Sequence, residues 1–404
     1  MKCGLLGQTL GHSYSPQIHG LLADYEYRLY EKEPSELEAF LRNEDFSGLN
    51  VTMPYKQAVI PYLDELTPIA AQLGAVNTIV RRDGKLVGHN TDYAGFLAMV
   101  KKSGLSPTGK KCVILGSGGA SRVAQAVLKM LGAEVVVISR SGDHNYGNIR
   151  CHEDAAIVVN TTPVGMYPNT GISPVELSVF THLEGVLDLI YNPARTKLLM
   201  DAEKQGIITI NGLWMLVAQA KEAAEWFTGT TISDNRIAEI HRILKSRMEN
   251  VILIGMPGCG KTTVGRMLAT HTGRAFADMD KEVEKLAKKS IPTIFAQEGE
   301  SRFRDWETEA LELCGKNSGL VIATGGGCVT MERNYPILHQ NGTIFWLQRS
   351  VDSLPIDGRP LSIKHDLHQM YAARKPLYAQ YADHIIDNNG TPAESAAAIL
   401  EVLL

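Results

Sequence analysis

Short hydrophobic runs alternate along the chain with longer amphipathic stretches. This alternation is typical of a parallel sheet covered by helices, so we predict an α/β fold throughout. The runs at 111–115 and 251–254 each end at a glycine-rich turn that leads into helical sequence, as the first strand of a nucleotide-binding fold does. A further run at 135–138 follows the first of these turns. The pattern therefore predicts two nucleotide-binding sheets in succession.

The hydrophobic pattern also predicts where the first module ends. Apolar residues recur every three or four positions from Ile237 to Met248, which indicates a helix with one apolar stripe. The next strand begins directly after Asn250, without a linker rich in Gly, Ser or Pro. We therefore expect two modules, 1–249 and 250–404.

Composition and charge narrow the class of protein. A chain of 404 residues is long enough for two or three domains, and its net charge of −4 gives no general attraction to nucleic acid or anionic membrane. No apolar stretch approaches the ~20 residues of a membrane helix, and no signal peptide follows Met1. The six cysteines have no zinc-ligand spacing, so we expect reduced thiols in a cytoplasmic protein.

A phosphate-binding loop is the most specific motif. The segment 255–262 fits the pattern G-x-x-x-x-G-K-S/T between a predicted strand and a predicted helix. Its backbone N–H groups surround phosphates, Lys261 adds a cation, and the Thr262 hydroxyl is a Mg²⁺ ligand. A glycine turn with an exposed lysine is the alternative, but the flanking elements favour ATP. The predicted nucleotide ligands are Gly255, Gly258, Cys259, Gly260, Lys261, Thr262 and Thr263.

The sequence from this loop to the C-terminus resembles shikimate kinase. The resemblance is carried, in order, by Asp278-Met279-Asp280, Gly299-Glu300 with Phe303-Arg304, Gly325-Gly326-Gly327, Arg359-Pro360-Leu361, and Arg374 to Tyr378. It implies that Asp278 joins Thr262 at Mg²⁺, that Asp280 is the partner of the acceptor hydroxyl, and that Arg304 and Arg374 clamp the substrate carboxylate. It further implies that Gly325, Gly326 and Gly327 approach the ring and that Arg359 acts catalytically from a lid.

Each of these residues also has a structural interpretation. Asp278 could cap a helix, and a single arginine is more often a solvated surface charge. The stretch between Leu347 and Arg359 departs from the family pattern because it is short. The resemblance therefore does not predict the kinetics of the lid. The order of five motifs favours the kinase interpretation.

The first glycine turn resembles a dinucleotide fingerprint with one departure. Ser121 stands where G-x-G-x-x-G has its third glycine. Arg140 follows the second strand, where an arginine accommodates the 2′-phosphate of NADP. The alternatives are that the fold binds a flavin or another nucleotide, or that Arg140 is simply exposed. The stretch after Arg140 leaves no room for a full helix before Asn160. The predicted NADP(H) ligands are Gly116, Ser117, Gly118, Gly119, Ala120, Ser139, Arg140 and Thr161.

Residues on both sides of this turn resemble shikimate dehydrogenase. The matching segments are Gly11 to Pro16, Asn50 to Lys56, Gly74 to Thr78, Asn90 to Phe96, Asn160 to Met166, Asp188 to Tyr191 with Pro193, and Gly212 to Gln219. Reduction of a ketone needs a proton donor at the developing alkoxide, and Lys56 held by Asp92 is the candidate. Whether Lys56 transfers the proton or only positions the substrate is left open. The implied substrate ligands are Ser13, Ser15, Thr52, Asn77, Tyr191 and Gln219. The resemblance also implies that the first module is divided into a substrate lobe (1–108 plus about 214–249) and a dinucleotide lobe (about 109–213).

Together the resemblances imply a bifunctional enzyme that reduces 3-dehydroshikimate to shikimate and then phosphorylates shikimate. It would use NADP(H), ATP and Mg²⁺, with small-molecule substrates and neither nucleic acid nor membrane as partner. One alternative is a ligand-sensing regulatory protein built from the same folds, although retention of Lys56, Asp92, Lys261, Asp278 and Asp280 argues against it. Another is a quinate or shikimate dehydrogenase that prefers NAD, fused to the kinase.

Overall fold

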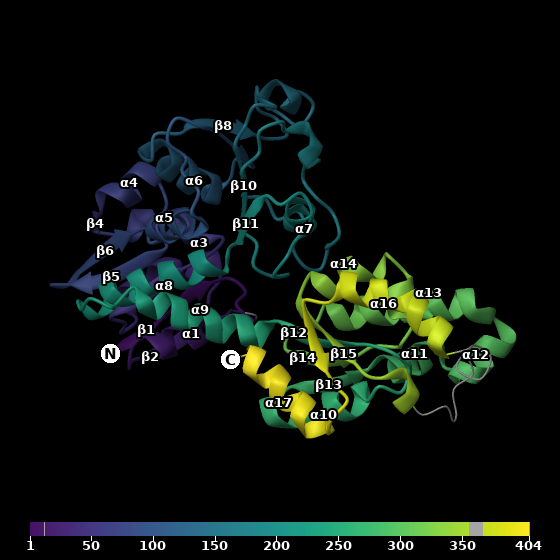
Figure 1. Cartoon of the computed structure of the whole chain (residues 1–404). Coiled ribbons are helices and arrows are strands. Elements are labelled where there is room, and N and C mark those ends of the chain that lie inside the picture. Colours follow the sequence, from purple (N-terminus) through teal and green to yellow (C-terminus); the bar gives the residue numbers. More distant parts are fainter. Residues whose placement is uncertain (12, 355–366, 404) are drawn as a thin grey trace. The chain divides into compact units, whose positions relative to one another are not determined.

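The computed structural model describes residues 1–11, 13–354 and 367–403. Its packing divides the chain into two compact units (Figure 1). Unit 1 comprises Met1–Val164, Ser173–Tyr191 and Asp201–Ile243, and unit 2 comprises Gly165–Ile172, Asn192–Met200 and Leu244–Leu404. The packing thus places two short segments from the first part of the sequence in unit 2. The module boundary at 249/250 stays a prediction from the sequence.

Unit 1 begins with a six-stranded sheet of strand order β2-β1-β3-β5-β6-β4. Its strands are β1 (Lys2–Gly7), β2 (Glu26–Glu31), β3 (Gly48–Val51), β4 (Glu65–Leu66), β5 (Thr78–Arg82) and β6 (Lys85–His89). Its helices are α1 (Ser15–Leu22), α2 (Leu37–Asn43), α3 (Tyr55–Ala58), α4 (Pro68–Leu73) and α5 (Asp92–Ser103). β1 is parallel to β2 and β3, whereas β5 and β6 form an antiparallel hairpin. The hairpin turn uses Asp83 and Gly84, both at positive φ, a combination that suits a two-residue loop.

The second sheet of unit 1 is fully parallel, with strand order β11-β10-β9-β7-β8. The strands are β7 (Lys111–Leu115), β8 (Glu134–Ile138), β9 (Ile157–Asn160), β10 (Gly185–Asp188) and β11 (Ile208–Asn211). The helices in this part of the chain are α6 (Gly119–Met130), α7 (Lys197–Glu203), α8 (Leu213–Thr228) and α9 (Asn235–Met248). By the unit bounds, the start of α7 and the end of α9 belong to unit 2. Between β8 and β9 the chain forms only a 3-10 turn, Ile149–His152, which confirms that no full helix fits there.

Helix ends in unit 1 follow local chemistry. Thr67 precedes α4 and its Oγ1 accepts a hydrogen bond from the backbone N–H of Ala70, while Pro68 occupies the first turn, where its missing N–H costs nothing. α4 ends at Gly74, which has a φ of 59° and is left-handed. The apolar stripe predicted for α9 is confirmed, because Ile237, Ile240, Leu244 and Met248 are buried.

Unit 2 is built on a five-stranded sheet with strand order β13-β14-β12-β15-β16. All of its strand pairs are parallel. The strands are β12 (Asn250–Ile254), β13 (Ala275–Asp278), β14 (Leu320–Ala323), β15 (Gly342–Gln348) and β16 (His384–Asp387). The helices are α10 (Lys261–Thr272), α11 (Met279–Ala287), α12 (Ile291–Gln297), α13 (Gly299–Gly315), α14 (Asn334–His339), α16 (Leu367–Tyr381) and α17 (Pro392–Leu403).

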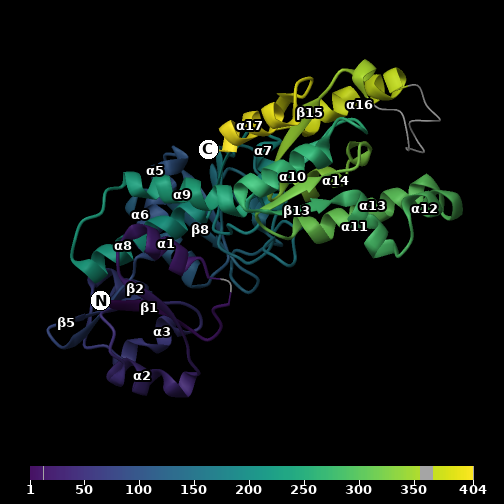
Figure 2. The same cartoon turned by 90° about the horizontal axis from the view of Figure 1, so that it is seen from below.

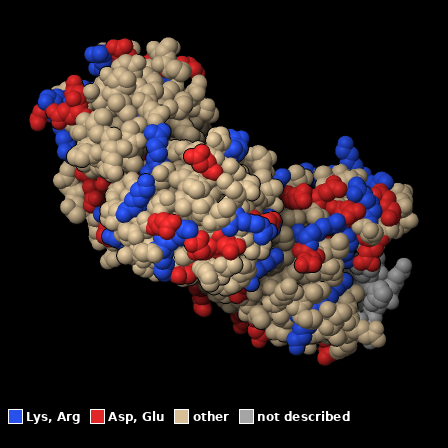
Figure 3. All heavy atoms as spheres, turned by 90° about the horizontal axis from the view of Figure 1, so that it is seen from above, with Lys and Arg blue, Asp and Glu red and all other residues tan. Residues whose placement is uncertain are grey.

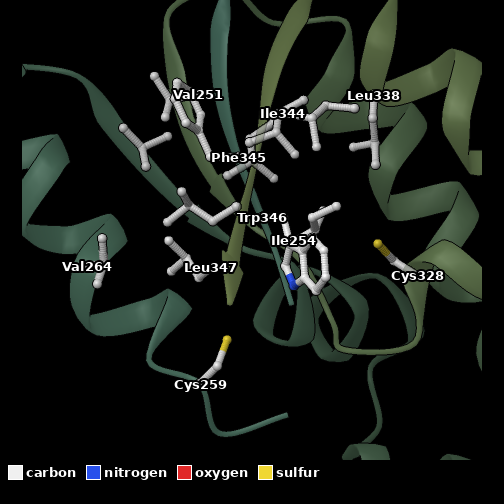
Figure 4. Packing of buried hydrophobic residues seen from close by; sticks show 14 of the residues in the cluster. Val251, Ile254, Cys259, Val264, Cys328, Leu338, Ile344, Phe345, Trp346 and Leu347 are labelled. Carbon is white, nitrogen blue, oxygen red and sulfur yellow. The ribbon is translucent and has the colours of Figure 1, made fainter. Parts of the chain in front are cut away.

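The core of unit 2 lies around the central strand β12. All five residues of β12 are buried, as expected for a strand covered on both faces by helices. Leu347 of β15 lies on the side of Val264 of α10, whereas Ile254 and Trp346 lie on the side of Cys328, all within one cluster (Figure 4). α10 and α17 pack against each other and lie side by side in Figures 1 and 2. Because parallel strands end at one edge, the loops that follow β12, β13 and β14 meet there.

The surface carries charges of both signs. Acidic and basic side chains are interspersed over the face shown in Figure 3. In the part of the chain that the structure describes, no helix combines the length and hydropathy that a bilayer crossing requires. All six cysteines are described and free, and Cys151 is the exposed one.

Candidate active sites

The predicted catalytic pair of the dehydrogenase part is formed. Nζ of Lys56 lies 2.6 Å from Oδ2 of Asp92. Lys56 belongs to the short helix α3, and Asp92 is the first residue of α5, so two separate elements bring the charges together. The Asp92 backbone N–H also donates to the side chain of Asn90, at 3.1 Å. The lysine is therefore held in one direction while about a third of its side chain stays accessible.

A buried polar network joins two predicted substrate ligands. Oδ1 of Asn77 accepts the backbone N–H of Thr91 at 2.7 Å, and Nδ2 of Asn77 donates to Oγ1 of Thr91 at 3.0 Å. The same Thr91 hydroxyl lies 3.3 Å from Oε1 of Gln219 on α8. Asn77 and Thr91 are buried. Thr91 thus fixes the orientation of two amides, although the sequence did not single it out.

The four other predicted substrate ligands, which lie on loops and at a helix start of unit 1, are Ser13, Ser15, Thr52 and Tyr191. Ser13 Oγ accepts the backbone N–H of Ser15 at 3.2 Å, just where α1 begins. Thr52 follows β3 and its N–H donates to the carbonyl of Leu6 at 2.9 Å. Tyr191 packs edge-on against Tyr14, with ring centroids 6.2 Å apart, and burial raises the pKa of Tyr191.

The glycine turn after β7 leaves open space at the start of α6. Gly116 has a φ of 103°, and a Cβ there would lie 2.8 Å from Oγ1 of Thr161. A Cβ at Gly118 or Gly119 would meet no other atom within 4 Å, so the backbone at the start of α6 faces open space. Thr161 itself is anchored to the carbonyl of Leu115 at 2.7 Å. The site fits a dinucleotide phosphate at a helix N-terminus.

The end of β8 carries the residue predicted to select NADP. Arg140 is exposed directly after the strand, and Ser139 N–H donates to the carbonyl of His144 at 3.1 Å, which closes a short loop. Burial raises the pKa of Tyr146 in this loop, and the positive charge of Arg140 opposes that rise. Ser121, the departure from the glycine fingerprint, is fully buried and bonded to Gln125 at 3.2 Å.

The phosphate-binding loop of unit 2 has the expected backbone. Gly255, Gly258 and Gly260 have φ values of 144°, 84° and 99°, which side chains rarely adopt. Nζ of Lys261 is 2.9 Å from the carbonyl of Gly255 and 3.0 Å from that of Met256. The ammonium therefore points into the loop that it is predicted to share with phosphates. Cys259 is buried in the same loop, and Thr263 is exposed on α10.

The predicted magnesium ligands are adjacent. Oγ1 of Thr262 donates to Oδ2 of Asp278 at 3.0 Å, and Oδ1 of Asp278 accepts the backbone N–H of Asp280 at 3.2 Å. Asp278 thus caps α11, the structural role weighed from the sequence, and also contacts Thr262. Among the described residues no cluster of His, Cys, Asp or Glu forms a complete metal cage. A hydroxyl and one carboxylate suit Mg²⁺ that is shared with nucleotide phosphates.

Asp280 lies close to the glycine segment that follows β14. The pKa of Asp280 is raised, first because neighbouring atoms remove part of its hydration and second because the Asp278 carboxylate is near. A Cβ at Gly325 would lie 3.3 Å from Oδ1 of Asp280 and would overlap Oε1 of Glu307. Glycine is therefore required here by close packing.

Arg304 is a buried arginine held by two carboxylates. On α13 it is 5% exposed, with Nη1 2.8 Å from Oε2 of Glu307 and Nη2 3.1 Å from Oε1 of Glu300. Burial lowers the pKa of Arg304, but the two carboxylates outweigh it and the net shift is upward. A Cβ at Gly327 would overlap the Arg304 guanidinium. The Arg304 guanidinium therefore packs directly against Gly327.

Arg374 approaches the same segment from α16. Its Nη1 donates to the carbonyl of Gly326 at 3.2 Å, and the hydroxyl of Tyr378, one turn further along the helix, donates to the same carbonyl. Asp280, Arg304 and Arg374 thus contact or flank residues 325–327 from three helices. This brings the predicted carboxylate clamp and the predicted hydroxyl partner to one place. Arg359 lies outside the described residues.

Glu307 is a site residue that the sequence did not reveal. It is 1% exposed, burial raises its pKa, and among the described residues Oε1 has no hydrogen-bond partner. That oxygen faces Gly325. In sequence, Arg304 and Glu307 are three residues apart on a helix, a spacing that surface ion pairs share. Only the burial of Arg304 and Glu307 distinguishes this pair from an ion pair on the surface of a helix.

Comparisons with known proteins identify the family of each part of the chain. A shikimate dehydrogenase (NADP(+)) of Clostridium perfringens is 35% identical over 269 residues, which cover 60% of this chain and 98% of the relative. The family model for the shikimate dehydrogenase substrate binding domain matches residues 5–79. The chain belongs to the shikimate dehydrogenase family. A shikimate kinase family model matches residues 257–404, so the predicted dehydrogenase–kinase fusion and both enzyme classes are confirmed.

Solved structures of this family give the same picture. The chorismate mutase/shikimate 5-dehydrogenase fusion protein from Clostridium acetobutylicum is 34% identical, with a TM-score of 0.58, and the match covers 60% of this chain and 97% of that one. The quinate dehydrogenase from Corynebacterium glutamicum in complex with NAD is 30% identical, with a TM-score of 0.54, covering 59% and 97% respectively. The α/β fold class predicted from the sequence is confirmed.

Proposed function

We propose that this bifunctional shikimate-pathway enzyme works in the biosynthetic direction, with NADPH reducing 3-dehydroshikimate to shikimate and ATP then phosphorylating that shikimate to shikimate 3-phosphate. The observation that carries the proposal is the presence, in one chain, of a shikimate dehydrogenase part and a shikimate kinase domain. The product of the first reaction is the acceptor of the second. Small-molecule substrates are common to both families; a cytoplasmic location stays a prediction from the sequence.

In the reduction, Lys56 acts at the carbonyl oxygen. When bound, the nicotinamide supplies a hydride to the carbonyl carbon, and the oxygen takes a proton. The ammonium of Lys56, fixed by Asp92 at 2.6 Å, stabilises the charge that develops on that oxygen and is the nearest predicted proton source. Ser13, Ser15, Thr52, Asn77, Gln219 and Tyr191 hold the hydroxyl and carboxylate groups of the ring. Their roles stay predictions.

NADP preference is assigned to Arg140. Its exposed guanidinium, just after β8, is the proposed partner of a 2′-phosphate. The proposed contacts of the rest of the dinucleotide are Gly116, Ser117, Gly118, Gly119, Ala120, Ser139 and Thr161. The similarity to a quinate dehydrogenase in complex with NAD supports one second candidate, an NAD-preferring quinate or shikimate dehydrogenase. Initial rates with NADPH and NADH, on 3-dehydroshikimate and 3-dehydroquinate, distinguish the two. A preference for NADH with 3-dehydroquinate contradicts the assignment.

In the phosphorylation, Asp280 receives the acceptor hydroxyl. Its raised pKa brings it toward the range in which a carboxylate accepts a proton efficiently. Arg304 and Arg374 bind the ring carboxylate beside Gly325, Gly326 and Gly327, and Lys261 with the loop glycines binds the ATP phosphates. Thr262 and Asp278 would hold Mg²⁺, which would supply positive charge to neutralise the phosphates. A catalytic role for Arg359, which lies outside the described residues, stays a prediction from the sequence.

The test combines both reactions in one vessel. The whole chain receives 3-dehydroshikimate, NADPH, ATP and Mg²⁺, and NADPH consumption and shikimate 3-phosphate formation are followed together. We expect equal yields of NADP⁺ and of shikimate plus its phosphate. NADPH consumption without any phosphorylated product, when added shikimate is also not phosphorylated, contradicts the proposal.

A further inference from the structure

Unit 2 has a cavity that belongs to neither active site. Its volume is about 590 Å³, within the range of small-molecule pockets. It lies where α10 ends and where β13 and β14 begin, between Thr272 and Ala275 and at Leu320. The phosphate-binding loop follows the opposite, carboxyl end of the same parallel sheet. A molecule in this cavity would therefore not touch the kinase site.

The side chains that line the cavity have one sign of charge. Arg247, Arg274 and His271 contribute basic groups, and no Asp or Glu is among the described lining residues. A pocket with cationic walls and no acidic side chain favours an anion over a cation or a neutral polar molecule. The net charge of the chain is negative, so the positive character is local to this cavity.

Arg274 presents ordered, unused donors. Its Nη1 donates to the carbonyl of Glu249 at 2.8 Å, and its Nη2 donates to the carbonyl of Ser246. These bonds use two of the five N–H groups of the guanidinium and fix its plane. No described residue accepts from the remaining donors. Burial lowers the pKa of Arg274, and only the Glu249 carboxylate opposes that effect. An anion in the cavity would compensate this charge.

Arg247 is the second available cation. It lies in the last turn of α9, is exposed, and makes no hydrogen bond or ion pair with the described residues. An arginine whose charge is unpaired is free to close on a carboxylate or phosphate with two parallel hydrogen bonds. Large apolar side chains also line the cavity, namely Leu320, Leu400 and Leu403, beside the small residues Ser246, Thr272, Gly273, Ala275, Ser318 and Gly319. Cationic and apolar side chains therefore line the same cavity.

We infer that this cavity binds a small organic anion, in which a carboxylate or phosphate group is joined to an apolar body. The charged group lies between Arg247 and Arg274, and the apolar body lies against Leu320, Leu400 and Leu403. This site is additional to the proposed function and does not depend on it.

The test measures binding to the whole chain with both active sites filled. Saturating NADP⁺, ADP, Mg²⁺ and shikimate occupy the known anion sites, and calorimetric titrations then use benzoate, phenyl phosphate and neutral phenol as probes. We expect one of the two anions to bind and phenol to bind at least about tenfold more weakly, because the neutral probe lacks the charge-assisted hydrogen bonds. Benzoate and phenyl phosphate distinguish the carboxylate from the phosphate.

Two variants locate the binding. Arg247→Gln removes an exposed, unpaired cation and leaves the fold intact, and it should weaken binding about tenfold. Arg274→Lys keeps a charge but loses the planar fork, and it should also weaken binding. Arg266→Gln is the matched control and should bind the anion as the parent does. Arg266 belongs to α10, lies over the Phe276 ring and does not line the cavity. Absence of binding by both anions, or equal binding by the Arg247→Gln and Arg266→Gln variants, overturns the inference.

Discussion

Nζ of Lys56 lies 2.6 Å from Oδ2 of Asp92, across the gap between the short helix α3 and the first turn of α5. The ion pair is only partly accessible, with side chains 32% and 17% exposed. It therefore combines access for a substrate with a fixed lysine. Substitution of this lysine is accordingly the most direct test of the dehydrogenase site.

Replacing Lys56 should stop reduction without affecting phosphorylation. In Lys56→Met the carbonyl oxygen loses its cation and its proton source, so kcat for 3-dehydroshikimate reduction should fall by about 10²- to 10⁴-fold. Phosphorylation of added shikimate, measured on the same preparation, should keep the parent rate. Lys85→Met, which removes a surface lysine paired with Glu65, is the matched control and should retain both activities. A Lys56→Met enzyme that reduces its substrate normally contradicts the assignment.

Adding one methyl group at Gly327 should damage the acceptor site of the kinase. The new Cβ would overlap the Arg304 guanidinium, which Glu307 and Glu300 hold in place. We expect Gly327→Ala to raise KM for shikimate about tenfold or more, with a much smaller change in KM for ATP. Gly20→Ala, where a Cβ meets open space, should leave both constants unaltered. Equal KM values for shikimate in the parent and in Gly327→Ala would show that the contact between Gly327 and Arg304 does not position the guanidinium for shikimate.

The acid limb of the kinase pH profile should depend on Glu284. The pKa of Asp280 is raised by lost hydration first, then by Asp278, and the Glu284 carboxylate also contributes. Asp280 must be ionised to accept the hydroxyl proton, so kinase kcat/KM should rise with pH through this raised pKa. In Glu284→Gln the limb should move to lower pH, while the amide oxygen still accepts the N–H of Ile291 as the carboxylate does at 3.0 Å.

Glu282→Gln is the control for this shift. Glu282 pairs with Lys285 at 3.5 Å and is not among the groups that raise the Asp280 pKa. Its profile should overlay that of the parent enzyme. The same displacement in both variants would indicate a general loss of negative charge on α11 instead of a local effect on Asp280.

Unit 1 should lose stability in acid because of His19. This histidine is 1% exposed and stacks on Tyr27 with ring centroids 4.1 Å apart, and burial lowers its pKa to about 3. Its folded pKa lies below the unfolded value of 6.5, so the stabilisation is complete above pH 6.5 and is lost as pH falls toward 3. In that window the unfolded chain binds one more proton, which corresponds to about 1.4 kcal/mol per pH unit.

Substitution of His19 tests that slope directly. His19→Phe keeps the stacked ring but cannot titrate, so the free energy of unfolding of unit 1 should fall less steeply between about pH 6 and about pH 4, a range between the folded and unfolded pKa values. At about pH 7.5 the variant should be less stable by about 1 kcal/mol, because the Tyr25 hydroxyl loses its partner. Exposed His182, replaced by Phe, should leave the slope unchanged. Identical slopes for the parent and His19→Phe would exclude His19 as the group responsible.

Sequence predicted best the features that short segments determine. The phosphate-binding loop was found because its glycines, lysine and threonine follow one another, and Lys56 and Asp92 were found because each sits in a distinctive short motif. Thr91 was not singled out, because its bond to Gln219 depends on the packing of α5 against α8, far along the chain. Glu307 was missed for a related reason, since only its burial beside Gly325 distinguishes it from a surface helix residue.

The tight fit of Gly327 against Arg304 has a consequence for evolving the kinase toward other acceptors. Neither position is free to change alone, because a larger residue at 327 displaces the guanidinium and a shorter one at 304 leaves Glu307 without its counter-charge. Variants selected for a bulkier ring should therefore carry compensating substitutions at 304, 307 and 327 together, and libraries that randomise one codon at a time should yield none.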